Sequence, residues 1–253
     1  MHLLERVVET PHGCAYLSAE RASLELCVML DVSAAELELL IERGWRRFGP
    51  LYFRPACVAC SECVSLRVCV ESFAPNKSQR RAARACARLR RVIGPPRVDV
   101  DRLALYAQWH EGREQARDWE PNPQTRSRYA REFAFPHSCA REVAVYDDDE
   151  GGRLVGIGLF DETPNALSAV FFFYDPTYAR MSLGTANVLS LIADARATGR
   201  AHVYLGYRVA GCASLRYKAN FRPHELLLGR PEMAERPEWR APDELPDGRT
   251  ANE

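Results

Sequence analysis

Long apolar runs, a secretory leader and a nucleophile motif are all missing from this sequence. No stretch of its 253 residues approaches the ~18 uninterrupted apolar residues of a membrane helix. The first ten residues lack the basic-then-apolar layout of a signal peptide. The histidines are scattered, and no serine lies in a nucleophile elbow. These absences predict a soluble, cytoplasmic protein with no membrane contact, and they give no support for a nucleophilic triad.

Acidic residues are scarce in one part of a chain whose formal net charge is zero. Between Arg43 and Arg97 thirteen Lys or Arg residues are accompanied by only two acids, Glu62 and Glu71, so this segment has a net charge of +11. Such a block concentrates positive potential in one place and predicts a local contact with a polyanion.

Cysteine, by contrast, is abundant, with nine residues. In the cytoplasm these thiols are expected to be reduced, so they are either ligands or small buried residues and not disulfides. The Cys57-x-x-Cys60-x-x-Cys63 run can direct three thiolates at one metal. Cys14 is the leading candidate for a fourth ligand, ahead of Cys69. Both interpretations stay open: a structural metal site, or buried thiols in a Cys-rich protein.

The periodicity of the apolar residues predicts both helices and strands. A Ser-x-x-Glu capping box at Ser33 begins a helix that ends at Gly44. A second helix begins at Asn76 or Ser78 and runs to about Val92. A third helix, a three-stranded antiparallel meander and a strand–helix–strand unit are expected after it. The third helix is expected over residues 99–117, and the meander strands over 142–147, 153–160 and 166–174. The strand–helix–strand unit, 171–207, continues from the last meander strand into a helix over 184–198 and a strand over 202–207.

These elements predict an α+β protein in two parts. The Gly-Pro-Pro at residues 94–96 separates an N-terminal Cys-containing α+β domain, residues 1–95, from a second domain, residues 96–228, with a mainly antiparallel sheet. The remainder, residues 229–253, is rich in Pro, Glu and Arg and is expected to form a flexible tail.

The second predicted helix carries a row of arginines. At spacings of four, four and three, one helix face would present Arg80, Arg84, Arg88 and Arg91, with Arg81 beside them. Guanidinium groups bind phosphates in bidentate fashion. A solvated surface face is the alternative, but the glutamates that usually pair with such arginines are missing. The pattern therefore favours nucleic acid.

The loop from Arg180 to Thr185 opens the helix of the strand–helix–strand unit. Free N–H groups at such a helix start, near Gly184, could hold an oxyanion or a phosphate. GNAT-fold acyltransferases place their pyrophosphate loop in this setting, but this chain has one glycine and a spacing that differs from the acyl-CoA signature. An ordinary turn between strand and helix is the alternative.

Polar and aromatic side chains cluster at and after the last strand of this unit. The cluster consists of Tyr204-Leu-Gly-Tyr207 and of Tyr217-Lys218-Ala-Asn-Phe221-Arg222-Pro. Such a density of Tyr, Lys and Asn is unlike a core and indicates a pocket wall.

Two long motifs resemble the arginyl-tRNA–protein transferase family. The first runs from Tyr52-Phe-Arg-Pro through the three clustered cysteines and Phe-x-Pro to Ser-Gln-Arg-Arg81. The second is the pair of Tyr-Leu-Gly-Tyr and Tyr-Lys-Ala-Asn-Phe-Arg-Pro. The match extends from about Cys14 to Glu225, and within the family the chain looks most like the bacterial aspartate/glutamate leucyltransferases.

The resemblance implies an N-terminal domain joined to a GNAT-like transferase domain. It implies transfer of leucine, or of arginine as in eukaryotic relatives, from aminoacyl-tRNA to proteins that begin with Asp or Glu, which marks them for degradation in the N-degron pathway. Eukaryotic relatives carry N-terminal cysteines associated with an iron–sulfur cluster or zinc, so a structural metal stays open, while the transfer itself needs no cofactor. The sequence departs from the pattern in several places, two of them in the expected pocket: Ala186 replaces a customary aromatic residue, and Arg208 replaces a usual Trp.

The implied reaction assigns roles to particular residues. Asp175 is expected to orient the acceptor amine or take its proton, and an N–H near Gly184 to stabilise the tetrahedral oxyanion. The candidate cations for an acidic acceptor are Arg54, Arg67, Lys218 and Arg222. The expected contacts of the aminoacyl end are Tyr204, Tyr207 and Phe221, and further substrate contacts are Arg180, Thr185 and Tyr217. The arginine row at 80, 81, 84, 88 and 91 is expected to bind the tRNA backbone.

Two other functions are consistent with the residues alone. One is a GNAT-type N-acyltransferase that uses an acyl-CoA. The other is a non-catalytic RNA-binding protein that is stabilised by a structural metal ion.

Overall fold

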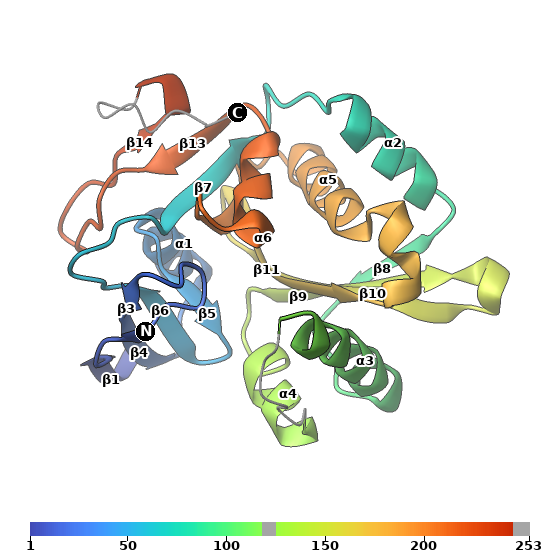
Figure 1. Cartoon of the computed structure of the whole chain (residues 1–253), viewed down its shortest axis with the longest axis horizontal. Helices are drawn as coiled ribbons and strands as arrows, with labels where there is room; N and C mark the ends of the chain where they lie inside the picture. The colour runs from blue at the N-terminus through green and yellow to red at the C-terminus, as the bar shows by residue number, and fades with distance from the viewer. Residues whose placement is uncertain (118–124, 245–253) are drawn as a thin grey trace.

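The computed structural model describes residues 1–117 and 125–244 (Figure 1). Its largest element is an eight-stranded sheet with the order β14-β13-β7-β12-β11-β10-β9-β8. In chain order the strands are β7 (Val64–Cys69), β8 (Arg90–Gly94), β9 (Ala140–Asp147), β10 (Arg153–Glu162), β11 (Ala166–Tyr174), β12 (His202–Arg208), β13 (His224–Leu227) and β14 (Trp239–Arg240). Neighbouring strands pair antiparallel except β11 and β12, which are parallel.

The parallel pair is the feature that opens a site. Strands β11 and β12 are joined through the short 3₁₀ helix η2 (Pro176–Met181) and helix α5 (Leu183–Ala197). Their register begins at Ala166 opposite His202 and ends at Ser168 opposite Tyr204, so the remaining length of β11 diverges from β12. The antiparallel meander, the strand–helix–strand unit and the α+β class with a mainly antiparallel sheet are thereby confirmed.

The N-terminal residues form a smaller sheet with the order β1-β4-β6-β5. Its strands are β1 (His2–Val8), β4 (Leu24–Leu30), β6 (Leu51–Pro55) and β5 (Arg46–Phe48), and a separate two-stranded hairpin consists of β2 (His12–Gly13) and β3 (Arg21–Ala22). Helix α1 (Ala34–Glu42) begins at the predicted capping box, in which Ser33 and Glu36 bond to each other's backbone N–H. Leu37 of this helix is buried in a core cluster with Trp45 and Tyr52.

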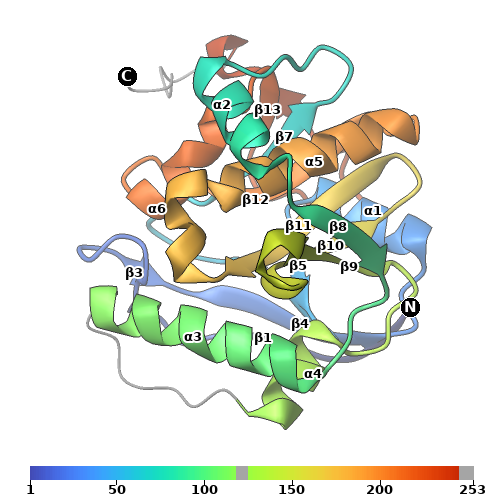
Figure 2. The same ribbon diagram turned by 90° about the vertical axis from the view of Figure 1, so that its right-hand side faces the viewer.

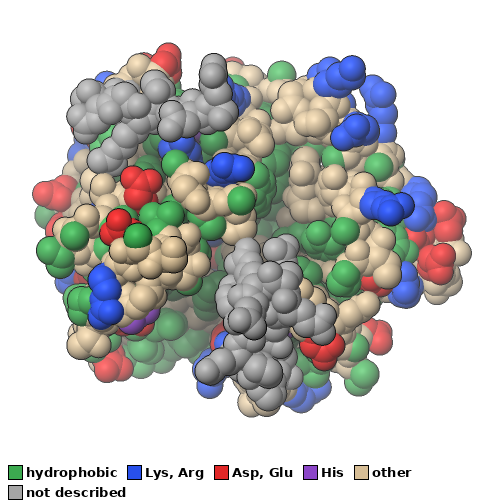
Figure 3. All heavy atoms as spheres, viewed as in Figure 1, with side chains coloured by type: hydrophobic (Ala, Val, Ile, Leu, Met, Phe, Trp, Pro, Cys, Tyr) green, Lys and Arg blue, Asp and Glu red, His purple; other side chains and the backbone are tan. Residues whose placement is uncertain are grey.

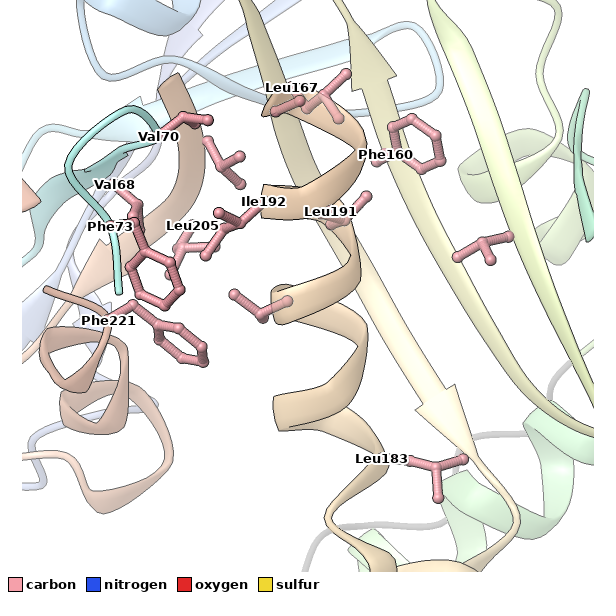
Figure 4. Packing of buried hydrophobic residues seen from close by; sticks show 14 of the residues in the cluster. Val68, Val70, Phe73, Phe160, Leu167, Leu183, Leu191, Ile192, Leu205 and Phe221 are labelled. Carbon is pink, nitrogen blue, oxygen red and sulfur yellow. The ribbon is translucent and has the colours of Figure 1, made fainter. Parts of the chain in front are cut away.

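Helices cover both faces of the large sheet (Figures 1 and 2). Helices α2 (Lys77–Cys86) and α5 pack together on one face, and α3 (Val100–Arg117) contacts β10 and β11 on the other, close to α4 (Arg126–Phe133). Figure 4 shows Leu191 and Ile192 of α5 pointing into the core beside Leu205. In the described residues, no helix combines the length and the apolar character needed to cross a membrane.

The predicted extent of the second helix is wrong. Helix α2 ends at Cys86, and residues 90–94 instead form β8, which pairs with β9. Leu89 is buried at the turn between them, where the chain changes direction. After this turn, Val92 and Ile93 pair with residues of β9 instead of continuing the helix. The division at residue 95 assigns β7 and β8 to the front domain, whereas both strands belong to the large sheet.

The segment from Gly229 to Glu244 is packed against the N-terminal part that contains the smaller sheet and α1. The sequence predicts a flexible tail here. Trp239 donates its indole N–H to the Glu42 carbonyl (3.1 Å), and Arg54 Nη1 donates to the Pro231 carbonyl (2.9 Å). Composition did not reveal these contacts because the arginines that bind the segment come from a distant part of the chain. Residues 245–253 lie outside the described residues.

Candidate functional site

A cleft of about 600 Å³ opens where β11 diverges from β12. It is bounded by β11, by the first turns of α5, and by the short helices α6 (Ala213–Arg216) and η3 (Tyr217–Asn220) that follow β12. The aromatic side chains that line it among the described residues are Tyr16, Trp109, Phe171, Phe172, Tyr174 and Tyr217. These rings provide flat apolar surfaces for a nucleobase or an aliphatic side chain.

The N-terminus of α5 supplies hydrogen-bond donors at one side of the cleft. Gly184 and Thr185 both line the cleft. Ser182 occupies the N-cap position with a left-handed φ of 60°, and no side-chain capping bond from it exists among the described residues. Because the first N–H groups of a helix have no partner within the helix, this end can bind a carbonyl oxygen or an oxyanion.

Lys218 is the one charged side chain among the described residues that line the cleft. Its ammonium donates to the Tyr207 carbonyl (2.9 Å). Burial, assisted by the positive charge of Arg46, lowers the pKa of Lys218 to about 7. The cleft therefore contains an ammonium that gains from meeting an anion, because a nearby negative charge would offset its desolvation.

Asn187 also lines the cleft, and the sequence analysis missed it. The residue is 9% exposed, and its Oδ1 has no hydrogen-bond partner among the described residues. Its amide lies against β10, where a Cβ on Gly158 would come within 2.7 Å of Oδ1. The available signal was an Asn one position before Val188 on the buried side of α5.

Four of the predicted residues meet at the cleft: Gly184, Thr185, Tyr217 and Lys218. Arg180 is exposed on η2, just before the α5 N-terminus. These assignments stay predictions, and the fold places the residues where substrates could reach them.

The carboxylate of Asp175, the predicted proton acceptor, binds neighbouring residues outside the cleft. The Thr177 amide and hydroxyl both donate to its Oδ1 (2.9 and 2.7 Å), and Arg153 lies 3.4 Å from its Oδ2. The residue is buried, caps η2 and is not part of the cleft lining. The position directly after β11 suggested catalysis, but in the structure it serves the local turn.

Several predicted pocket residues lie in the junction between the two sheets instead. The Tyr207 hydroxyl donates to the Gly44 carbonyl (2.8 Å), and Tyr204 packs edge-on against Trp239. Arg54 is buried and pairs with Glu25 (2.6 Å) and with Glu232. Phe221 stacks on Phe73 in the core, and the exposed Arg222 donates to the Ala219 carbonyl (3.2 Å). Polar aromatic residues indicated a pocket, but here the Tyr207 hydroxyl binds backbone carbonyls of the N-terminal part, and the Tyr204 hydroxyl accepts a hydrogen bond from Arg67 (3.3 Å).

Arg67 lies outside the cleft as well. It pairs with Glu225 (2.7 Å) and stacks over Trp239, with its Cζ 4.4 Å from the ring centroid. Arg67 and Trp239 border a separate open groove that is also lined by Arg236 and Arg240.

The predicted arginine row is divided by the end of α2. Arg80, Arg81 and Arg84 lie on α2 and are exposed, and in the described part of the chain Arg81, Arg84 and Arg180 form no ion pair. Figure 3 shows Lys and Arg side chains gathered over α2. Arg88 pairs with Asp147, and Arg91 with Asp194 (2.6 Å), so these two charges are already partly neutralised.

The four predicted metal ligands, Cys14, Cys57, Cys60 and Cys63, are neighbours in the structure. Burial, together with the proximity of the Cys57, Cys14 and Cys60 thiols, raises the pKa of Cys63 to about 12. In residues 1–117 and 125–244, however, no three Cys, His, Asp or Glu side chains are placed to hold a metal ion. Four thiols are a suitable zinc or iron–sulfur ligand set, but these would have to move closer together, so the metal stays a prediction.

The chain matches two family models. Residues 12–81 match "Arginine-tRNA-protein transferase, N terminus", and residues 101–228 match "Arginine-tRNA-protein transferase, C terminus". It is 38% identical to the aspartate/glutamate leucyltransferase of Halorhodospira halophila, over 87% of this chain and 92% of that protein. It is 30% identical to that of Helicobacter hepaticus, over 89% and 93%. Among solved structures it is similar to L-PGS from Bacillus licheniformis (TM-score 0.42, 13% identity, 69% of this chain and 50% of that chain).

Proposed function

The chain belongs to the arginine-tRNA-protein transferase family, and from this we propose that it transfers leucine from leucyl-tRNA to the N-terminal Asp or Glu of acceptor proteins. Family membership makes it an aminoacyltransferase that moves an amino acid from tRNA to protein, in place of an acyl-CoA enzyme or a non-catalytic RNA-binding protein. The choice of leucine follows the names of its relatives. We place the reaction in the cytoplasm, where it would mark acceptors for N-degron-dependent degradation.

The observation that carries the acceptor assignment is the ammonium of Lys218, the one charged group among the described residues of an aromatic cleft. A desolvated cation selects strongly for an anionic group that can pair with it. An acidic N-terminal side chain meets that requirement, and a neutral one leaves the ammonium buried without a counter-ion. Arg54, Arg67 and Arg222 support this role less well because each lies outside the cleft.

The tRNA is assigned to the side of the molecule formed by α2 and η2. The thiol of Cys86, the last residue of α2, lies 3.4 Å from the Met181 carbonyl at the end of η2. The exposed charges of Arg81 and Arg84 therefore lie on the helix that leads to the α5 N-terminus. Phosphates bound there would place the acceptor end of the tRNA beside the cleft.

The chemistry requires little beyond positioning. The acceptor amine attacks the ester carbonyl, the N–C bond forms, and the C–O bond to the tRNA ribose breaks. The proton lost by the amine ends on the departing ribose oxygen. Holding both reactants in place can contribute about 7–11 kcal/mol. The free N–H groups near Gly184 are the donors available for the tetrahedral oxyanion.

The proposal is tested with purified protein, radiolabelled leucyl-tRNA and peptides that differ only in their first residue. Label is expected on Asp- and Glu-initiated peptides, and the Ala-initiated peptide is expected to react at least about 100-fold more slowly, because it leaves the buried ammonium unpaired. Failure to label the Asp peptide would contradict the proposal.

Charge reversal on α2 is expected to weaken tRNA binding. For Arg81→Glu combined with Arg84→Glu, we predict at least a tenfold loss of tRNA affinity at about 0.1 M salt. The slope of log affinity against log salt concentration should also become shallower by about two. The matched control is Arg126→Glu with Arg131→Glu, two exposed arginines on α4. Filter binding with uncharged tRNA measures both pairs. Equal losses in the two pairs would show that the α2 face has no special role.

A further inference from the structure

A second hollow lies beside the cleft, between the C-terminal half of α2, the first turns of α5 and strand β9. Its volume is about 320 Å³. Phe172 and Asn187 line both this hollow and the cleft, so the two spaces lie on either side of one wall. The hollow therefore faces the side assigned to tRNA, and the cleft faces the side assigned to the acceptor.

Small and apolar side chains form this hollow. Ala83 of α2, Ala87 directly after that helix and Ala186 of α5 line it together with Leu183 and Val145. Arg91 is the one charged residue among its described lining, and this guanidinium is paired with Asp194 (2.6 Å). A guanidinium entering here would lose its hydration without gaining an unpaired carboxylate. The hollow consequently favours an uncharged, apolar group.

The wall between the two spaces contains the unpaired amide of Asn187. Its Oδ1 is buried, and in the described residues no donor reaches it. Leaving a buried carbonyl oxygen unpaired destabilises a protein unless something else supplies the donor. Gly158 leaves room for this amide, since a Cβ there would approach Oδ1 to 2.7 Å. Oδ1 therefore faces β10 in this conformation, and rotation of the side chain would present this vacant acceptor to a ligand at the wall.

We infer that this hollow receives the side chain of the amino acid being transferred and accepts bulky apolar side chains as large as that of phenylalanine, while Asn187 Oδ1 accepts a hydrogen bond from the α-ammonium. The inference rests on the proposed function. An aminoacyl ester presents a side chain, an α-ammonium donor and a carbonyl, and these correspond to the hollow, to Asn187 and to the N–H groups that begin α5.

Size is the reason for including phenylalanine. An apolar cavity of about 150 Å³ already holds a benzene molecule. The hollow is about twice that volume, and Ala186 contributes only a methyl group to its lining. A larger side chain at position 186 would occupy the space that an aromatic aminoacyl group needs, while the smaller leucyl group would still find room.

The test uses one tRNA charged in turn with leucine, phenylalanine or arginine, together with an Asp-initiated peptide. The wild-type protein is expected to transfer leucine and phenylalanine at rates within about tenfold of each other, and arginine at least about 100-fold more slowly. Ala186→Phe is expected to lower the phenylalanine-to-leucine ratio at least tenfold. Ala197→Phe, at an exposed position near the end of the same helix, is the matched control and should leave the ratio unchanged.

A second variant addresses the amide. Asn187→Leu has a similar size and removes an unpaired buried group, so its melting temperature should not fall, whereas single-turnover transfer should slow about 10–100-fold. An unchanged rate overturns the role of Asn187, and an unchanged phenylalanine-to-leucine ratio in Ala186→Phe overturns the role of the hollow. A wild-type protein that transfers no leucine overturns the proposed function itself, which keeps the two failures distinct.

Discussion

Lys218→Met is expected to reduce leucine transfer to an Asp-initiated peptide by about 100-fold or more while making the protein more stable at neutral pH. The loss of activity follows because the acceptor carboxylate would enter the cleft without a counter-ion, a change that typically costs about 2–5 kcal/mol. Methionine keeps a similar length and removes the charge. Transfer kinetics with an Asn-initiated peptide should be nearly unchanged, since that acceptor brings no carboxylate.

The gain in stability follows from the pKa of the ammonium. In the folded protein the pKa of Lys218 is lowered to about 7 from its ordinary value of 10.5. Between these two values the unfolded chain binds a proton that the folded chain does not, so this group makes the free energy of unfolding rise with pH across that window. Below about pH 7 both states are protonated and the folded state bears the full cost of the buried charge.

Removing the charge should therefore stabilise the protein most at or below pH 7 and hardly at all near pH 10.5. We expect a gain of about 2 kcal/mol at pH 7, or about 4–8 °C in Tm, after allowing for relaxation of the site and for the lost bond to the Tyr207 carbonyl. Thermal unfolding of both proteins at several pH values measures the difference. A variant that is less stable than wild type at pH 7 would show that the ammonium is not desolvated in this way.

The largest effect on stability is expected from Arg47→Met, with a loss of about 3–5 kcal/mol. Arg47 on β5 and Asp161 on β10 are both buried and form a two-point ion pair across the junction of the two sheets, with Nε 3.1 Å from Oδ2. Without the guanidinium, the Asp161 carboxylate stays buried and loses its counter-ion. Urea unfolding gives the change in the free energy of unfolding.

Two further variants separate this pair from a general effect of charge. Arg47→Met combined with Asp161→Leu removes both charges and should recover most of the loss. Arg141 pairs with Glu162 (2.8 Å) where both side chains are about one-third exposed, so Arg141→Met should cost less than about 1 kcal/mol. If the double variant is no more stable than Arg47→Met alone, the loss comes from packing and not from an orphaned charge.

The parts of the fold that local chemistry determines could be predicted from the sequence. The α1 capping box needs only Ser33 and Glu36, three residues apart, and both of its hydrogen bonds form. The meander and the helix after it follow from periodicity and turn residues. The end of α2 could not be predicted this way, because β8 forms only by pairing with β9, about fifty residues later in the chain.

The site shows the same division between local and distant causes. Gly184 and Lys218 could be selected because a helix start and a lysine in a polar aromatic segment are visible in the sequence. Tyr207 was expected in the pocket, whereas its hydroxyl partner, the Gly44 carbonyl, comes from the turn after α1, more than 160 residues earlier in the chain. Asn187 was missed because an unpaired amide becomes evident only when its surroundings are known.

The central claim is that this protein attaches leucine to an acidic N-terminus. The most direct measurement incubates the protein with a tRNA pool charged with all amino acids, isotopically labelled leucine among them, and with two peptides that begin with Asp or Asn. Mass spectrometry of the products should find labelled leucine on the Asp-initiated peptide and at most a trace on the Asn-initiated one. Arginine as the added residue, or equal addition to both peptides, would contradict the account.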